Sequence, residues 1–176
     1  MPFLQAPFIS RLQESLDKDA PNFVEGTEGE LDKDGKPSPP IKWASAWSEA
    51  TGLGAQGLMT MPFPPISNML ISSGEAAMKS TLLGVTPQTP PFAVLKSGFT
   101  TFASTITSGW LPTYIGIPPG GPPNFESLSP IGMASPTPTP WIIQCAAMLS
   151  SWFMTGAVIP TYPVGINMGA PPSPWL

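Results

Sequence analysis

Charged side chains gather at the start of this chain, and their distribution limits how the remainder can fold. Of the 18 charged residues, 13 lie within the first 42 positions, and the other 134 positions carry five. After Glu126 the only ionisable groups are Cys145, Tyr162 and the C-terminus. A freely soluble monomer carries roughly a quarter charged residues. We therefore expect much of the surface after residue 42 to be covered by protein or lipid instead of water.

The residue types that most enzymes and metal sites need are scarce. Histidine, the commonest general base and metal ligand, is absent, and Cys145 is the single cysteine. We expect a protein that is not an enzyme, with no catalytic residues, no cofactor and no metal ion. No Lys or Arg follows Lys96, so the basic cluster that binds a phosphate backbone is missing. Nucleic acid is therefore not an expected partner.

Residues 1–17 are predicted to form an amphipathic helical arm. Apolar side chains recur there at every fourth position: Leu4, Phe8, Leu12 and Leu16. This spacing places them on one side of a helix over 4–17 and leaves the charged residues on the other side. The helix could pack on its own domain, dock on a neighbouring subunit or lie on a membrane surface. The stretch 18–41 is acidic and contains glycine and proline, which is typical of a linker with an extended end.

The charge-poor stretch 42–176 is predicted to be one mainly α domain that also contains extended segments. Trp43 and Trp47 can line one side of a first helix, and residues 66–83 predict a second. The large apolar side chains supply the burial that such a domain needs to offset the entropy of ordering its chain. We therefore expect it to fold as a single unit.

Two segments of this domain, 86–123 and 135–172, are similar to each other and indicate an internal duplication. Each opens with a proline-rich run and continues through a proline-free segment. That segment is closed by Leu-Pro-Thr-Tyr, ending at Tyr114, in the first unit and by Ile-Pro-Thr-Tyr, ending at Tyr162, in the second. Each unit predicts a helix followed by an extended surface strap, because proline is not found in interior strands.

The predicted helices of the two units differ in character. Residues 92–110 have apolar side chains on one side only, whereas residues 141–159 are uncharged and apolar around more of the circumference. A 19-residue uncharged helix is long enough to cross a bilayer. The alternative function is therefore a small phage or bacterial membrane protein, holin-like, with 141–159 as its span. Polar interruptions such as Gln144 and the absence of flanking Lys or Arg weigh against it.

We expect the leucine and aromatic side chains to anchor packing or contacts with neighbouring subunits. Interface cores are depleted of charge and enriched in Trp, Tyr, Phe and Met, as this region is. The predicted anchors are Leu4, Phe8, Leu12, Leu16, Trp43, Trp47, Trp110, Tyr114, Trp141, Trp152 and Tyr162.

The repeated Pro-Thr-Tyr and Gly-Ile motifs of residues 86–172, set in an apolar body without histidine, resemble in style the small structural proteins of tailed-phage particles. The resemblance implies a component of the tail, baseplate or capsid, located in the virion. It also implies that the partners are other protein subunits of the particle, or copies of the chain itself. The function predicted from the sequence is therefore that of a structural or adaptor subunit.

Overall fold

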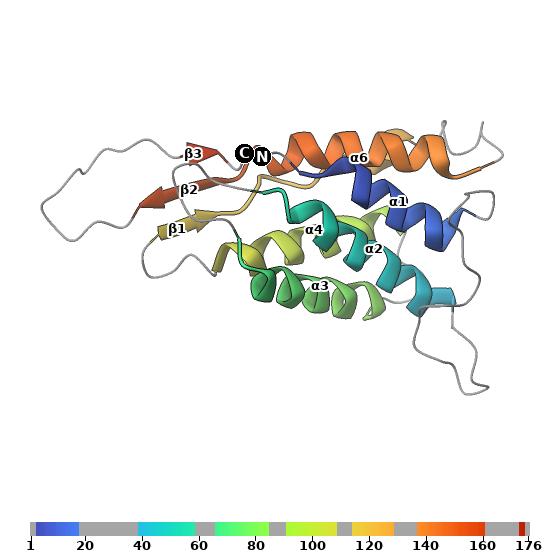
Figure 1. Ribbon diagram of the computed structural model, residues 1–176, viewed down its shortest axis with the longest axis horizontal. Coiled ribbons are helices and arrows are strands. Elements are labelled where there is room, and N and C mark those ends of the chain that lie inside the picture. The colour runs from blue at the N-terminus through green and yellow to red at the C-terminus, as the bar shows by residue number, and fades with distance from the viewer. Residues whose placement is uncertain are drawn as a thin grey trace, which may run out of the picture.

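Five α-helices, one short 3-10 helix and three short strands form the described part of the chain in the computed structural model (Figure 1). The structure describes residues 3–17, 39–58, 66–84, 91–108, 114–128, 137–160 and 173–174. The helices are α1 (Gln5–Leu16), α2 (Pro39–Ala55), α3 (Asn68–Leu83), α4 (Pro91–Thr107), η2 (Phe125–Leu128) and α6 (Thr139–Phe153). The prediction of a mainly α fold is confirmed.

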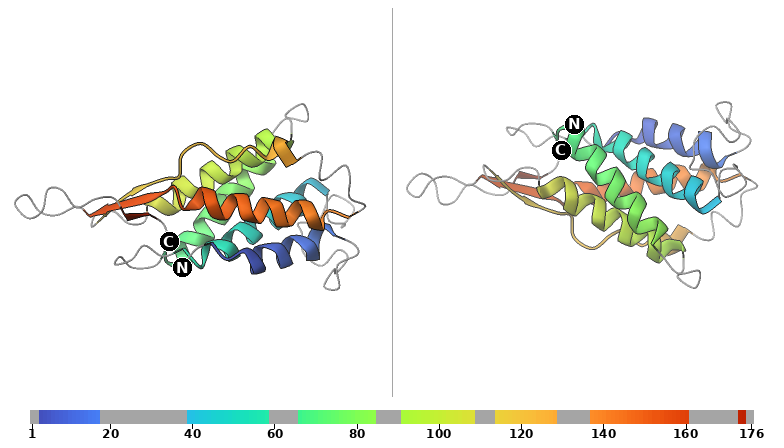
Figure 2. Two further views of the ribbon diagram at one scale, coloured as in Figure 1. Left: turned by 90° about the horizontal axis from the view of Figure 1, so that it is seen from above. Right: turned by 90° about the horizontal axis from the view of Figure 1, so that it is seen from below.

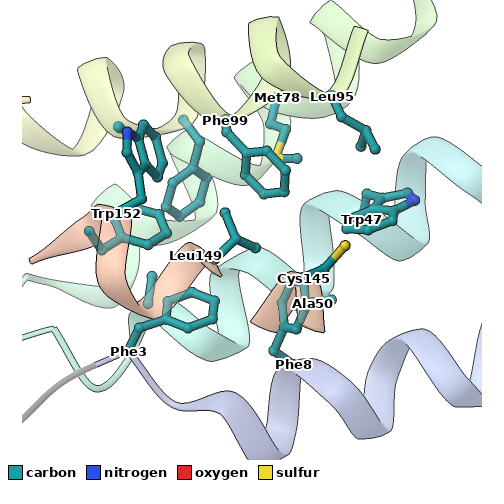
Figure 3. Close-up of a cluster of buried hydrophobic side chains, with 14 of the residues drawn as sticks. Phe3, Phe8, Trp47, Ala50, Met78, Leu95, Phe99, Cys145, Leu149 and Trp152 are labelled. Carbon is teal, nitrogen blue, oxygen red and sulfur yellow. The ribbon is translucent and has the colours of Figure 1, made fainter. Parts of the chain in front are cut away.

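The helices form a bundle in which the first and the last helix are neighbours. α1 packs on α2, α2 on α3 and α3 on α4, so these four helices follow chain order. α6 lies beside α1 (Figures 1 and 2). Side chains from all five α-helices meet in one apolar core, among them Phe8, Trp47, Met78, Phe99 and Leu149 (Figure 3).

α1 forms where the four-residue spacing predicts a helix, and it packs on its own chain. Phe8 and Leu12 are fully buried, and the partly buried Leu16 packs against the same core. Leu4 is partly buried just before the helix, and its backbone N–H donates to the carbonyl of Gly54 at 2.8 Å. The sequence left open whether this helix packs on its own domain, on a neighbouring subunit or on a membrane surface. In the structure it packs on its own domain.

α2 begins before the boundary predicted at residue 42. Its first two residues are Pro39 and Pro40, which the sequence assigned to the extended end of the linker. Proline suits the first turn of a helix, because its missing N–H would have no intrahelical partner there. The linker prediction is therefore wrong for residues 39–41, and residues 18–38 lie outside the described part of the chain.

The predicted helix over 141–159 is shorter in the structure. α6 ends at Phe153 after 15 residues, a turn follows, and Ala157 begins a strand. Gly156 has low helix propensity, and the β-branched Val158 and Ile159 favour a strand where a partner strand is available. In the part of the chain that is described, no helix has the length and apolar character needed to cross a membrane.

The segments that follow α4 and α6 pair in a three-stranded antiparallel sheet. Its order is β1 (Tyr114–Ile117), β2 (Ala157–Pro160) and β3 (Ser173–Pro174). β2, the central strand, occupies residues 157–160, where the sequence predicted the end of a helix, and the strap predicted after Pro160 lies outside the described residues. The proline of β2 is its last residue, so the three residues before it keep their N–H groups and can pair.

The two predicted repeat units contribute different positions to this sheet. β1 begins at Tyr114, at the end of the first Pro-Thr-Tyr motif, whereas β2 ends at Pro160, at the start of the second. The internal duplication therefore stays a prediction from the sequence. Several of its segments lie outside the described residues, namely 86–90, 109–113, 135–136 and 161–172.

Candidate interaction surface

The predicted anchor Trp47 lies at the centre of the apolar core. It is 1% exposed, and its ring makes edge-on contacts with four other rings at centroid distances between 5.5 and 6.4 Å. Those rings belong to Phe8, Trp43, Phe99 and Trp141. Because they come from α1, α2, α4 and α6, Trp47 joins four helices of the bundle.

Trp152, near the end of α6, forms a hydrogen bond with the segment that connects β1 to η2. It is 6% exposed, and its indole Nε1 donates a hydrogen bond to the carbonyl of Gly120. Its ring lies 6.3 Å from that of Phe99 and 4.8 Å from that of Phe153, measured between centroids. Trp152 therefore also serves packing within the chain.

The remaining predicted anchors are placed as follows. Trp43 and Trp141 are partly buried and pack against the core. Trp110 and Tyr162 lie outside the described residues, and Tyr114 belongs to β1 without a described side chain. The described anchors thus pack within the chain, in the core or against it.

The outer face of α6 is uncharged, and several of its apolar side chains are exposed. It consists of Ile143, Gln144, Ala147, Ser151 and the following Met154, all of which are exposed. Ile143 is 45% exposed and Met154 is 44% exposed. An open hollow of about 470 Å³ lies on this face, lined by Pro123, Ala147, Met148, Ser151, Trp152 and Thr155. This face has no charge that a partner would have to neutralise or desolvate.

Ile143 and Ala147 are not among the anchors predicted from the sequence, although a signal for them exists. Positions 143, 147 and 151 recur every four residues without a charge, which places them on one side of a helix. The neighbouring positions Ile142 and Ala146 are fully buried. α6 therefore carries apolar residues on its outer side as well as on the side that faces the core.

A group of charged side chains lies where α2 packs on α1 and on α3. Arg11 Nε donates to Glu49 Oε2 at 2.9 Å, and Arg11 Nη1 lies 3.7 Å from Glu14 Oε2. Glu75 of α3 is partly buried against α2, where it occupies the space that a side chain at Gly52 would take. Burial, with the negative charge of Glu49 as a second cause, raises the pKa of Glu75 from 4.5 to about 7.

We expect Glu75→Gln to stabilise the protein at pH 8 and to change little at pH 4. The folded state holds the Glu75 proton more tightly than the unfolded chain does, since the pKa rises from 4.5 to about 7 on folding. The wild type therefore loses stability as the pH rises through this interval, and the loss is complete above it. Glutamine carries no charge and avoids that loss.

Thermal unfolding measured from pH 4 to pH 8 tests this prediction. The melting temperature of Glu75→Gln should exceed that of the wild type by a few degrees at pH 8, and the difference should vanish towards pH 4. Glu126→Gln is the control, because Glu126 lies in an exposed ion pair with Lys96. A difference between Glu75→Gln and the wild type that is the same at every pH would contradict the prediction.

The described residues offer little for metal or nucleophilic chemistry. No group of three or more His, Cys, Asp or Glu side chains is placed among them to hold a metal ion. Cys145 is fully buried in α6, and burial raises the pKa of its thiol. A thiol in such a setting stays protonated and reacts poorly, because the thiolate is the nucleophile.

Comparison of the chain with models of protein families, with curated proteins and with solved structures found no match.

Proposed function

We propose that the chain is a non-enzymatic structural or adaptor subunit of a large protein assembly, and that it binds neighbouring subunits through the outer face of α6. The observation that carries the proposal is the uncharged, partly apolar character of that face. Ile143 and Met154 are exposed there, and Ala147 and Ser151 of the same face line the open hollow. The buried part of a protein interface has this composition, with few charged residues.

The scarcity of charge has a physical reason in such a subunit. An ion that is buried without a partner costs several kcal/mol, so a surface covered by neighbours favours uncharged residues. Ser151 and Thr155 supply hydroxyl groups that can form hydrogen bonds across a contact without this cost. The outer face of α6 thus combines apolar contact area with neutral polar groups.

Support for a particular kind of assembly comes from the sequence of residues 86–172, which resembles in style the small structural proteins of tailed-phage particles. That resemblance favours a tailed-phage particle, with this chain as a tail, baseplate or capsid component located in the virion. Its partners are then other protein subunits of the particle. The charged cluster of Arg11, Glu14 and Glu49 lies where α1 meets α2 and involves no residue of the α6 face.

Sedimentation of the chain from the cells that make it tests the proposal. The wild-type chain should sediment with megadalton particles, and Ile143→Glu should move it to the slowly sedimenting fractions, because the new carboxylate would be buried in the contact. Ser72→Glu is the matched control, since Ser72 is also an exposed helical residue. It should stay with the particles.

Two results would count against the proposal. A wild-type chain that sediments as a small free species would show that it is not part of a large assembly. The Ile143→Glu chain could also stay in the particles while its unfolding curve matches that of the wild type. This result would show that the outer face of α6 is not the contact surface. The unfolding curves of all three proteins show whether the substitutions act on the contact and not on the fold.

A further inference from the structure

The N-terminal arm, residues 3–17 of the described chain, packs on the rest of the bundle as a separate helical ligand would. Its helix α1 packs on α2 and on α6. Phe8, Leu12 and Leu16 recur at every fourth position and all contact the core. This is the pattern by which amphipathic helices bind to other proteins. Figure 3 shows the rings of Phe3 and Phe8 pointing from the arm into the apolar core.

The surface that receives the arm, which we call the arm site, is built by α2 and α6. Phe3 stacks on Phe153 of α6 with 5.1 Å between ring centroids, and Phe8 meets Trp47 of α2 edge-on at 6.0 Å. Three polar contacts fix the start, the middle and the end of the arm. The backbone N–H of Leu4 donates to the carbonyl of Gly54 at 2.8 Å, Arg11 Nε donates to Glu49 Oε2 at 2.9 Å, and the hydroxyl of Thr139 donates to the carboxylate of Asp17.

None of these contacts requires the arm and the arm site to belong to the same chain. Each joins a residue of the arm to a residue of α2 or α6. The arm of a second copy would make the same contacts with the same geometry. Docking within one chain and docking between two chains therefore differ only in the free energy of bringing the arm to the site.

The connection between α1 and α2 is much longer than docking within one chain needs. Figure 1 shows that the end of α1 and the start of α2 lie at the same end of the bundle. A connection of about 2–8 residues usually joins such neighbours. Here residues 17–38 connect Leu16 to Pro39. Fully extended, this connection spans roughly 70 Å, whereas α2 with its 17 residues is about 25 Å long.

We propose that the arm is exchangeable, and that within the assembly it occupies the arm site of a second copy of this chain. This inference names a copy of the chain as one neighbouring subunit, and in that respect it rests on the proposed function. The exchange of an identical element between subunits is a low-cost route to association, because every contact already exists in the single chain.

The balance between the two modes of docking depends on concentration. A linker presents the arm to the site of its own chain at an effective concentration on the order of millimolar. Subunits held side by side in a particle are tethered too, so a neighbour offers its arm site at a comparable effective concentration. In dilute solution the own site is favoured, whereas in the assembly the neighbour's site becomes accessible. An exchanged arm would link two subunits by burying Phe3, Phe8 and Leu12 between them.

Mixing two purified full-length variants tests whether arms exchange. In Gly54→Ala the new Cβ atom collides with the ring of Phe3, so the arm fits its own site poorly. Phe3→Ala keeps an unchanged arm site and carries an arm without the ring. Reciprocal exchange places the unchanged arm on the unchanged site and the arm without the ring on the narrowed site, so the collision disappears. In sedimentation equilibrium the mixed dimer should have a dissociation constant at least tenfold below that of the wild-type dimer.

A mixture of Gly54→Ala with the wild type is the matched control. After exchange one of the two arms would still collide with the narrowed site, so this mixture should gain nothing over the wild type alone. The inference is overturned if the mixture of Gly54→Ala and Phe3→Ala associates no more tightly than this control does.

Shortening the connection provides a second test that keeps both the arm and the arm site unchanged. When residues 18–38 are deleted, Asp17 alone joins Leu16 to Pro39, which is too short for α1 to turn back onto α2 of the same chain. The arm can then dock only on another copy, so the variant should sediment as a dimer at micromolar concentration. Deleting residues 24–31 leaves a connection of sufficient length and should leave the chain as the wild type is. A monomeric 18–38 deletion variant would overturn the inference.

The outcomes separate this inference from the proposed function. Arms that exchange in the purified mixture, in a chain that never enters megadalton particles, would support the inference and count against the function. A chain that enters particles through the outer face of α6, while the mixed variants and the 18–38 deletion variant stay monomeric, has the reverse meaning.

Discussion

Replacing Gly54 with alanine should undock the N-terminal segment and destabilise the protein by about 1–3 kcal/mol, the usual cost of overpacking a core. A Cβ atom at Gly54 would collide with the ring of Phe3, since Cε1 of that ring would lie only 2.7 Å away. Phe3 is 2% exposed, stacks on Phe153 at 5.1 Å and meets Phe8 edge-on at 5.4 Å. Moving the ring would break both aromatic contacts, and urea unfolding measures the loss.

A double-mutant cycle shows whether the collision with Phe3 causes the destabilisation by Gly54→Ala. Alanine has a higher helix propensity than glycine by up to about 1 kcal/mol. In a Phe3→Ala background the collision is gone, so Gly54→Ala should be neutral or stabilising there. The destabilisation by Gly54→Ala should therefore disappear or reverse in the Phe3→Ala background. An equal destabilisation in both would mean that Gly54 is required for another reason.

Replacing Trp47 with alanine should have the largest effect of any single substitution considered, about 3–5 kcal/mol of lost stability. Trp47 is 1% exposed and contacts the rings of Phe8, Phe99 and Trp141, which lie on three other helices. Small proteins are stable by about 5–15 kcal/mol in total. We expect the variant to unfold at a much lower urea concentration, or to be partly unfolded in buffer.

Two matched variants sharpen this prediction. Trp43 lies one helical turn away on α2 and is only partly buried, so Trp43→Ala should cost less than half as much. Trp47→Phe keeps a ring and removes the indole Nε1, which is buried without a hydrogen-bond partner among the described residues. Removing a buried N–H that has no hydrogen-bond partner should stabilise the variant, and this gain offsets part of the stability lost with the smaller ring. A Trp43→Ala variant as unstable as Trp47→Ala would show that the core does not centre on Trp47.

The sequence predicted the helices well where one periodic signal was sufficient. The four-residue spacing of Phe8 and Leu12 places α1 correctly, and the helix predicted over 66–83 corresponds to α3. In both cases the signal is local, because an amphipathic helix needs only an apolar stripe to be recognised. The end of α6 was missed, because Val158 and Ile159 continue an apolar run and become a strand only through β1, some forty residues earlier.

The candidate surface was harder to predict than the fold. Large side chains such as Trp47 and Trp152 have the composition of an interface, yet they lie inside the bundle. Which side of α6 faces outward depends on where α1 and the connection to η2 pack, and no local pattern contains that information. The raised pKa of Glu75 likewise arises from its tertiary position against Gly52 and Glu49.

The pairing of the first helix with the last affects how the chain can fold during synthesis. Thr139, at the start of α6, donates to the carboxylate of Asp17 and accepts from Gln13 Nε2 at 3.3 Å. A ribosome adds about 5–20 residues per second, so α1 emerges many seconds before the helix that completes its environment. During this interval α1 can already pack on α2, and the side later covered by α6 stays available to chaperones. Nascent chains halted before residue 139 should therefore be far more sensitive to proteases than the finished protein.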